Sequence, residues 1–487
     1  MDTLNTDCLL RIFIKLDFTS RVRLETHPCA FSDITKLDAS RYVQPTTSNY
    51  FQQDTIDFEP KIVGILRRCG PALREIGFGS RWLRISQPII DHIAKYCQQL
   101  TRLDLGCVIL NADISPILRN VAQKLEYFSL EESSWIKEEH ALKVNNYLGR
   151  MKSIVRLNLR KFVYSLDNIV GVSHNLEVVD LSGTRQLSLK VLGEFLSSHV
   201  NLKEVTICPF PNFHYQHSAP PTTKFSGLEG DDPELLQTAI DAFKELNALS
   251  FLSLGHIRKE FLSLKPLAEL TNLRVLHIQD CKCIDSGSLK HILLRTNQLR
   301  ILSLIDCPHI EDYSSLSRCT ALYELEIRHT AQLSDHDVDL IAQNGMLKRF
   351  RLEKCNNITN KSIVTLVCHC PLIELELSKC ENIGEDLFAL KPVWNNMRIN
   401  ILSLNGTSAI TNQAVAHLSE ANVIEHIREL DLSYIKNVDD SAIRRIHEAL
   451  NDRKSAKKRK ALIIYVSHTG VTRALKKEVQ PEIELVF

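Results

Sequence analysis

The chain has 487 residues, of which 44% are hydrophobic and 24% are charged, and its formal net charge is +1. This composition is typical of a globular protein and gives no overall field that would favour nucleic acid or a membrane surface. No apolar run approaches the roughly 18 residues of a membrane-spanning helix, and the opening MDTLNTDC is too polar for a signal peptide. We therefore expect a cytoplasmic or nuclear protein that binds neither nucleic acid nor membrane.

The N-terminal residues carry an apolar stripe at helical spacing, and Thr6 or Asp7 can cap the predicted helix. We assign residues 1–41 to a small helical module and residues 42–58, rich in Gln, Thr, Ser and Asn, to a linker. The stripe consists of Leu9, Leu10, Ile12, Phe13 and Leu16. A further helix of the module is predicted to begin with Phe31, Ile34 and Leu37.

A short phrase then recurs, from LREIGF at 73–78 to IRELDL at 427–432. It has a leucine, two residues, a leucine, one residue, and a leucine or isoleucine, as in LIELELSKC at 372–380. About fourteen copies follow at intervals of roughly 22 to 28 residues, which is the period of a leucine-rich repeat. The alternation inside the phrase is that of a half-buried strand, so Leu375 and Leu377 should be buried while Glu374 and Glu376 face outward.

Each phrase is followed by the signature of a helix, as in ITNKSIVTL at 358–366 and ITNQAVAHL at 410–418. Short polar side chains stand where a helix N-cap belongs, namely Ser334, Thr359, Thr411 and Asp439. The predicted fold class is therefore α/β. Residues 59–487 should form a leucine-rich-repeat solenoid, a curved horseshoe with parallel strands inside and helices outside.

Cysteine occupies the position where the chain turns out of the strand in several repeats, and threonine fills it in others. A small buried side chain with weak hydrogen-bonding ability suits this place, so we expect free thiols there and a reducing compartment. The cysteines are Cys281, Cys307, Cys355 and Cys380, and the threonines are Thr184, Thr330 and Thr407.

Motifs for catalysis are missing from the sequence. It contains no nucleophile elbow, phosphate-binding glycine loop or HExxH motif. Cys281-Lys-Cys283 and Cys368-His-Cys370 lack a second ligand pair at the spacing of a zinc site. We therefore predict a binding protein with no catalytic residue, no metal and no cofactor.

Charged residues alternate along the predicted inner face of the sheet. Arg351 should lie between Glu326 and Glu376, and Arg328 beside Glu353, which would make a self-compensating charge ladder. The central column is predicted to contain His277, Ser303, Glu326, Arg351, Glu376, Ser403 and Asp431.

An apolar patch precedes this ladder, and just upstream the interval between phrases stretches to make room for an insertion at 208–233. Neighbouring exposed apolar residues usually mark a contact, and long insertions in repeats are often functional. Either the insertion covers the patch or both form a substrate site. The candidate substrate-binding residues are Phe251, Val275, Ile301 and Ile305 of the patch and Phe213 and Tyr215 of the insertion.

Near the end, the basic run KSAKKRK at 454–460 is either a solvated loop or a nuclear import signal. The LIIYVSH that follows is predicted to be the closing strand.

The repeats resemble the cysteine-containing leucine-rich repeats, and the first residues resemble the F-box. Asn5 stands where the F-box usually has proline, and of its usual ending only Cys29 and Phe31 remain. The resemblance implies a non-catalytic substrate-recognition subunit of an SCF ubiquitin ligase, which links an unknown protein substrate to a Skp-type adaptor and a cullin for ubiquitination and degradation. The implied adaptor-binding residues are Leu4, Leu9, Leu10, Ile12, Phe13 and Leu16.

Two alternatives remain open. The N-terminal helices could only cap the first repeat of a binding scaffold or inhibitor. The spacing of Thr3, Leu4, Cys8 and Ile12 also fits the box that binds elongin C in another class of cullin ligases.

Overall fold

The computed structural model divides into two compact units, Met1–Leu249 and Ser250–Phe487. Leu4 and the predicted N-terminal stripe at 9–16 lie outside the described residues, as do Phe213 and Tyr215 of the insertion. The structure describes residues 31, 33–39, 55–79, 83–184, 187–207, 233–257, 260, 262–452 and 460–487.

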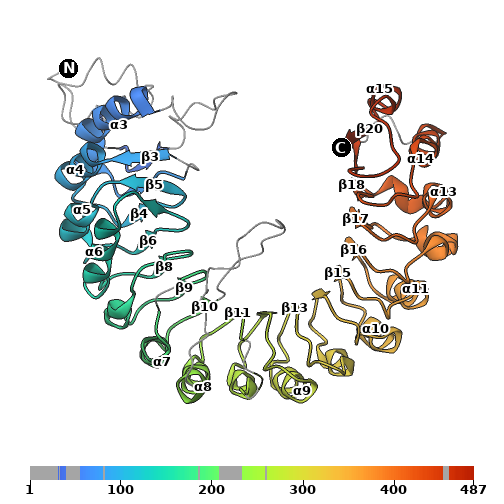
Figure 1. Cartoon of the computed structure of the whole chain (residues 1–487), viewed down its shortest axis with the longest axis horizontal. Coiled ribbons are helices and arrows are strands. Elements are labelled where there is room, and N and C mark those ends of the chain that lie inside the picture. Colours follow the sequence, from blue (N-terminus) through green and yellow to red (C-terminus); the bar gives the residue numbers. More distant parts are fainter. Residues whose placement is uncertain are drawn as a thin grey trace, which may run out of the picture. The chain divides into compact units, whose positions relative to one another are not determined.

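In the first unit, a parallel main sheet has one strand from each successive repeat, and the helices lie on one side of it (Figure 1). The paired strands are, in order, β1 (Lys36–Asp38), β2 (Glu75–Gly77), β4 (Arg102–Asp104), β6 (Tyr127–Ser129), β8 (Arg156–Asn158), β9 (Val178–Asp180) and β10 (Glu204–Ile207). A small second sheet contains β3 (Leu83–Ser86), β5 (Val108–Asn111) and β7 (Ser134–Trp135). The helices are α3 (Thr55–Cys69), η2 (Gly70–Ala72), α4 (Gln87–Tyr96), α5 (Ser115–Val121), α6 (Glu138–Leu148), η3 (Asp167–Gly171), α7 (Leu189–Ser198), α8 (Pro233–Asp241) and η4 (Ala242–Glu245).

Strand β1 corrects the prediction of a helix that begins with Phe31, Ile34 and Leu37. Lys36 to Asp38 pair in register with Glu75 to Gly77, and Leu37 is buried. The reason is the edge of β2, whose backbone groups need partners and receive them from this segment. The repeat sheet thus begins inside the range 1–41 that we expected to be helical, and α3 begins at Thr55 inside the expected linker.

The second unit is also a parallel sheet with helices on one side (Figure 1). Its strands are β11 (Phe251–Gly255), β12 (Val275–Gln279), β13 (Ile301–Ile305), β14 (Glu324–Arg328), β15 (Arg349–Glu353), β16 (Glu374–Ser378), β17 (Ile401–Ser403), β18 (Glu429–Asp431), β19 (Leu462–Tyr465) and β20 (Ile483–Val486). Its helices are η5 (Lys265–Glu269), α9 (Ser286–Arg295), η6 (Ser314–Arg318), α10 (Asp335–Ala342), α11 (Asn360–His369), η7 (Glu385–Phe388), α12 (Lys391–Trp394), α13 (Asn412–Glu420), η8 (Asn422–Glu425), α14 (Asp440–Asp452) and α15 (Leu475–Glu478).

Every predicted phrase from 73–78 to 427–432 contains a strand of one of the two main sheets, so the predicted α/β repeat architecture is confirmed. LIIYVSH also forms a strand, β19, but β20 pairs beyond it, so the prediction that LIIYVSH closes the sheet is wrong. The strand β20 was missed because its alternating run of Ile483, Leu485 and Phe487 lacks the leading leucines of the repeated phrase.

The alternation inside each phrase decides which residues form the core. In β16, Leu375 and Leu377 are fully buried, whereas Glu374 and Glu376 remain partly exposed, as predicted. Burial of such leucines in successive strands stabilises the stack, at about 25 cal/mol per Å² of apolar surface removed from water. Each repeat therefore depends on its neighbours to cover its two open faces.

The predicted N-caps are confirmed. Ser334 Oγ accepts a hydrogen bond from the Asp337 amide at 3.3 Å, and Thr359 Oγ1 accepts one from the Lys361 amide at 3.3 Å. Thr411 Oγ1 accepts from the Gln413 amide at 3.2 Å. The Asp337 carboxylate also accepts from the Ser334 amide at 3.0 Å, which completes a capping box. These bonds satisfy helix amides that would otherwise lack partners.

The aligned cysteines are buried thiols, as predicted. Cys307 donates to the Ile278 carbonyl at 3.8 Å and Cys355 donates to the Ile327 carbonyl at 3.4 Å, and each carbonyl belongs to the preceding repeat. Thr407 Oγ1 donates in the same way to the Leu377 carbonyl of the preceding repeat. The side chain at this position therefore holds the turn against the neighbouring strand, which explains why cysteine and threonine exchange there.

The residue before each of these cysteines has a left-handed backbone, which the sequence did not reveal. The φ angles are 48° at Asp280, 53° at Asp306, 53° at Lys354 and 53° at Lys379. At this point the chain leaves the strand sharply, yet the amide still donates to the next repeat, as Asp280 does to the Ile305 carbonyl at 2.8 Å. Non-glycine residues rarely adopt this conformation, so the repeat stack holds them in it.

Candidate binding surface on the second unit

The strand register of the second unit arranges its outward side chains in three rows, because the pairing between neighbouring repeats stays in step. The first row is Phe251, Val275, Ile301, Glu324, Arg349, Glu374, Ile401, Glu429 and Ile463. The second is Ser253, His277, Ser303, Glu326, Arg351, Glu376, Ser403, Asp431 and Tyr465, which confirms the predicted central column. The third is Gly255, Gln279, Ile305, Arg328, Glu353 and Ser378.

Phe251, Val275 and Ile301 lie side by side in the first row, and we call them the apolar row. All three are partly exposed, and the Phe251 ring lies 5.6 Å from the ring of His277. The apolar row ends at Ile301, because the next residue of the first row is Glu324 on β14. It is therefore a short apolar strip with no covering segment among the described residues.

Ile305, the fourth predicted residue of the patch, does not join this strip. It lies four residues further along β13, which is about 13 Å at the rise of a strand. Its neighbours in register are Gln279 and Arg328. The structure thus brings three of the four patch residues together and places the fourth at the opposite end of the strand.

The charges of the next strands neutralise one another, although Arg351 does not bind the two glutamates that we expected. Arg351 lies between Glu326 and Glu376 in register, yet its guanidinium binds Glu324 at 2.6 Å and Glu374 at 2.7 Å, both in the first row. A long side chain reaches diagonally as easily as it reaches straight across, so register alone does not choose its partner.

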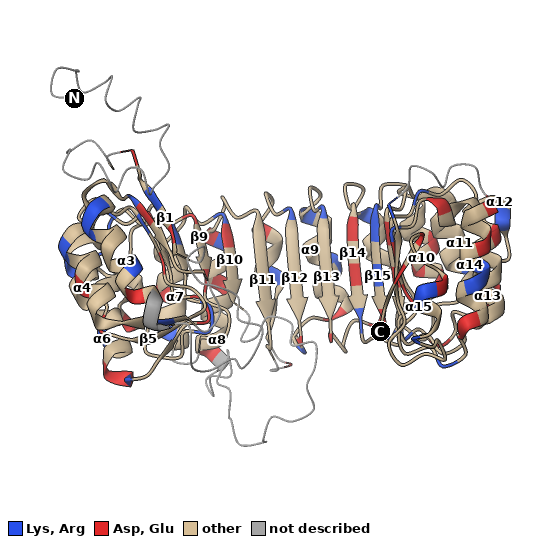
Figure 2. Ribbon diagram, turned by 90° about the horizontal axis from the view of Figure 1, so that it is seen from above, with Lys and Arg blue, Asp and Glu red and all other residues tan. Residues whose placement is uncertain are grey.

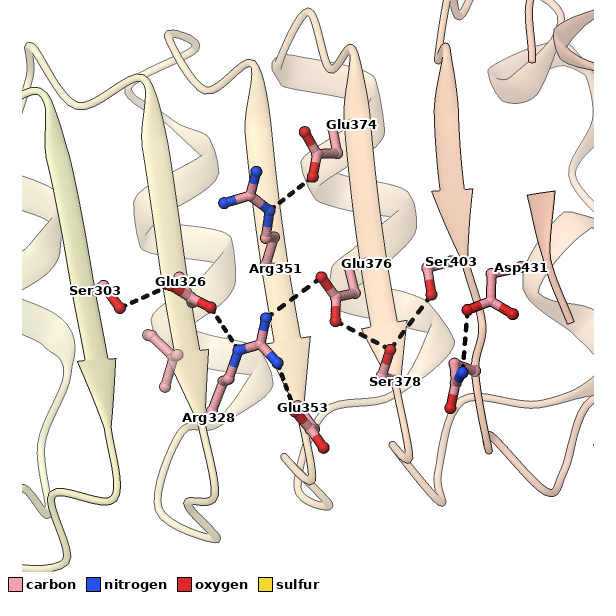
Figure 3. A network of polar contacts seen from close by, with 12 residues as sticks. Ser303, Glu326, Arg328, Arg351, Glu353, Glu374, Glu376, Ser378, Ser403 and Asp431 are labelled. Carbon is pink, nitrogen blue, oxygen red and sulfur yellow. Dashed lines mark hydrogen bonds and ion pairs between the residues drawn. The ribbon is translucent and has the colours of Figure 1, made fainter. Parts of the chain in front are cut away.

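Arg328 makes the second set of ion pairs (Figure 3). Its Nε lies 2.5 Å from Glu326, its Nη1 lies 2.6 Å from Glu353 as predicted, and its Nη2 lies 3.6 Å from Glu376. Only 12% of the Arg328 side chain is exposed, so these contacts are shielded from solvent much more than ordinary surface ion pairs. The predicted charge ladder is confirmed as a largely internal network.

Glu353 is the most buried carboxylate of this network. His329, Lys379 and Arg328 hold its pKa well below the usual range. Lys379 Nζ lies 2.8 Å from it, and His329 Nε2 lies 3.8 Å away. Because each negative charge already has a cationic neighbour, a charged ligand would have to displace internal partners to bind over these strands.

One set of cations was missed by the sequence reasoning. Arg274 and Arg300 each stand one residue before a strand, next to Val275 and Ile301 of the apolar row. Both are exposed. Reading the repeat template one position upstream would have found them.

Among the described residues, no group of three or more His, Cys, Asp or Glu is placed to hold a metal ion. No helix in the described part of the chain is both long enough and apolar enough to cross a membrane.

Parallel strands in register, alternate burial along each strand and small side chains beneath the turns define both units as leucine-rich-repeat structures. No family model matches the chain. The chain is similar to a solved leucine-rich-repeat protein of Leptospira interrogans, with 16% identity, a TM-score of 0.47, and coverage of 96% of this chain and 98% of that one.

Two further solved structures show similar values. The Rad7 and Elc1 complex of yeast matches with 15% identity and a TM-score of 0.44, covering 72% of this chain and 88% of the matched one. An internalin of Listeria monocytogenes matches with 15% identity and a TM-score of 0.40, covering 75% and 93%. At these values the likenesses carry no argument about partners, and the fold assignment rests on the repeat geometry itself.

Proposed function

We propose that this chain is the substrate-recognition subunit of an SCF-type ubiquitin ligase, present in the cytoplasm, the nucleus or both. The observation that carries the proposal is the F-box-like set of adaptor-binding residues placed ahead of leucine-rich repeats, namely Leu4 and the stripe of Leu9, Leu10, Ile12, Phe13 and Leu16. The stripe would bind a Skp-type adaptor and, through it, a cullin.

The mechanism would be proximity. The repeats hold a protein substrate while the cullin brings a conjugating enzyme close to the lysines of that substrate, which is then ubiquitinated and degraded. The gain is effective concentration, so the chain itself needs no catalytic group.

The substrate contact that we propose is the apolar row of Phe251, Val275 and Ile301. Covering partly exposed apolar side chains contributes about 25 cal/mol per Å², and the neighbouring charge network offers no free acidic or basic partner over β14 to β16. Phe213 and Tyr215 of the insertion remain candidate contacts, and so does Ile305 at the far end of β13.

One observation favours a second function, that of a non-catalytic scaffold or inhibitor. The pairing of β1 with β2 means that the segment upstream of residue 59 already covers the first repeat strand, which is the role of a cap. In that case, the N-terminal stripe would serve the stability of the repeats and bind no adaptor.

Affinity purification of the full chain separates the two functions. We expect a Skp-type adaptor and a cullin to co-purify, and we expect Ile12→Ala with Phe13→Ala to abolish this while the thermal transition of the repeats stays in place. Lys15→Ala, on the polar side of the same predicted helix, is the matched control. If no adaptor co-purifies with the unchanged chain, the scaffold function takes over, and recovery of elongin C instead would assign a different cullin.

Substrate capture is tested separately. Phe251→Asp with Ile301→Asp should prevent capture of a co-purifying substrate, whereas Ile401→Asp, in the same row beyond the charged positions, should not. Ile305→Asp shows whether the fourth patch residue takes part. Deletion of most of 208–233 distinguishes a recognition loop, which would lose capture, from a cover, which would enhance it.

A further inference from the structure

A row of residues runs along the edge of the second unit where its strands begin, and this row is basic. Each member's amide donates to the carbonyl of the preceding member, as Arg300 does to Arg274 at 2.8 Å. The strands therefore place these residues one strand spacing apart, about 4.8 Å. The row contains Ser250, Arg274, Arg300, Tyr323, Lys348, Ile373, Asn400 and Arg428, with no acidic residue among them.

The basic residues of this edge differ from those further along the strands. Arg328 and Arg351 are held by glutamates of neighbouring strands. Arg274, Arg300, Lys348 and Arg428 are exposed, and within the described part of the chain their side chains have no ion-pair partner. Figure 2 shows Lys and Arg at the beginning of strands of the second unit, at the edge opposite the arrowheads.

Arg274 and Arg300 form the part of this edge that also adjoins an apolar surface, and we call them the arginine pair. Two like charges on neighbouring strands repel each other, so an anion bound between them would gain energy from both. The residue after Arg274 is Val275, and the residue after Arg300 is Ile301. Cationic and aliphatic surfaces thus meet over two adjacent strands.

We propose that this surface binds an acidic segment of a protein partner. Its carboxylates would pair with the arginine pair, and its apolar side chains would cover the apolar row. The proposal rests on the proposed function insofar as this partner is the substrate, and it adds the chemical class that the substrate segment must have: Asp or Glu next to Leu, Ile, Val or an aromatic residue. Guanidinium groups suit carboxylates because they can donate two parallel hydrogen bonds.

The same surface is poorly suited to nucleic acid. A phosphate backbone needs a longer track of cations, yet the edge continues from Arg300 to Tyr323. The first row continues from Ile301 to Glu324, so a nucleic-acid strand bound along this row would bring its phosphates next to an acidic residue.

The test uses the full chain and a fluorescein-labelled peptide of alternating Glu and Leu. We expect saturable binding by fluorescence anisotropy, and we expect Arg274→Glu with Arg300→Glu to weaken it at least about tenfold, since the peptide would then meet like charges. Arg428→Glu, in the same edge but away from the apolar row, should leave the affinity unchanged. Peptides of alternating Lys and Leu, or Glu and Ser, should bind much more weakly because each lacks one of the two features.

Several results would overturn the proposal: no binding of the Glu–Leu peptide, binding that is insensitive to the arginine pair, or an equal loss with Arg428→Glu. Binding of a single-stranded RNA oligonucleotide that depends on the arginine pair, without peptide binding, would assign the surface to nucleic acid. Thermal unfolding of each variant verifies that it is folded. Adaptor co-purification is measured on the same variants, so failure of this proposal leaves the ligase function standing, and loss of the adaptor leaves the peptide result standing.

Discussion

His329 Nδ1 lies 2.7 Å from Asp306 Oδ1, so the left-handed turn residues of two successive repeats are joined by a side-chain contact. The same ring faces Glu353 with its other nitrogen, at 3.8 Å. The hydrogen bond to Asp306 and the contact with Glu353 raise the pKa of His329 to about 9. The imidazole is therefore a cation at neutral pH and belongs to the charge network.

This relationship predicts a pH dependence of stability. The pKa of His329 is higher in the folded state than in the unfolded chain, so its stabilising contribution is complete below about pH 6.5 and is lost as the pH rises through about 9. His329→Gln should lower the melting temperature most below about pH 6 and hardly at all above about pH 9.5. Equal losses at both pH values would contradict the assigned protonation.

The charge network should depend much more on one arginine than on another. Arg328→Met removes the closest partner of Glu326 and one of the partners of the buried Glu353, and we expect a loss of about 2 to 3 kcal/mol in the free energy of unfolding. Arg349→Met is the matched control, because 42% of the Arg349 side chain is exposed and its pairs with Glu324 and Glu374 should contribute less than about 1 kcal/mol. Denaturant unfolding measures both, and similar losses would show that burial does not govern the network.

The aligned thiols should be unreactive until the repeats unfold. Burial raises the pKa of Cys307 and Cys355 to about 12 and that of Cys380 to about 11. Since the thiolate is the reactive form, iodoacetamide should modify these residues only in denaturant, whereas the exposed Cys368 should react in the native protein. Mass spectrometry of the alkylated chain reads this out, and a stoichiometric disulfide among Cys281, Cys307, Cys355 and Cys380 would overturn the assignment to a reducing compartment.

The left-handed turn positions should reject β-branched residues. Lys354 is exposed and has a φ of 53°. The backbone conformation, and not the burial of the side chain, therefore determines which residue types this position accepts. Lys354→Ile should cost about 1 to 2 kcal/mol, because a branched Cβ clashes in this conformation. Lys354→Gly should change the stability by less than about 0.5 kcal/mol, since glycine enters the conformation freely but has more freedom to lose on folding. Denaturant unfolding measures both variants. Equal free energies of unfolding would show that the left-handed backbone at this turn does not restrict the residue type.

The local code of the repeat was readable without coordinates. Leu375 and Leu377 had to be buried and Glu374 had to face outward, because side chains alternate across a strand and only one face meets the helices. Ser334 and Thr359 had to cap helices, because few other side chains can accept a bond from an orphan amide. The same pattern placed His277 and Asp431 in one column, since equal phrases pair in equal register.

Other features were decided only by contacts between segments distant in sequence. β1 has three residues and no phrase of its own, and it became a strand because the edge of β2 offered it backbone partners. Ile305 looked like part of the apolar patch until the register placed it at the far end of β13. Arg351 binds Glu324 and Glu374 and not its neighbours in register, because a long side chain can reach diagonally to a different position on the next strand.

The sequence by itself therefore determined the class of fold, the buried face of each strand and the turn thiols, since these depend on spacing within one repeat. Only the tertiary structure decided which charged side chains form ion pairs and which, like Arg274 and Arg300, stay exposed at the edge of the sheet without an ion-pair partner among the described residues. That difference follows from the reach of each interaction: burial is dictated by the periodicity of a single strand, whereas an ion pair needs two side chains from different repeats to meet.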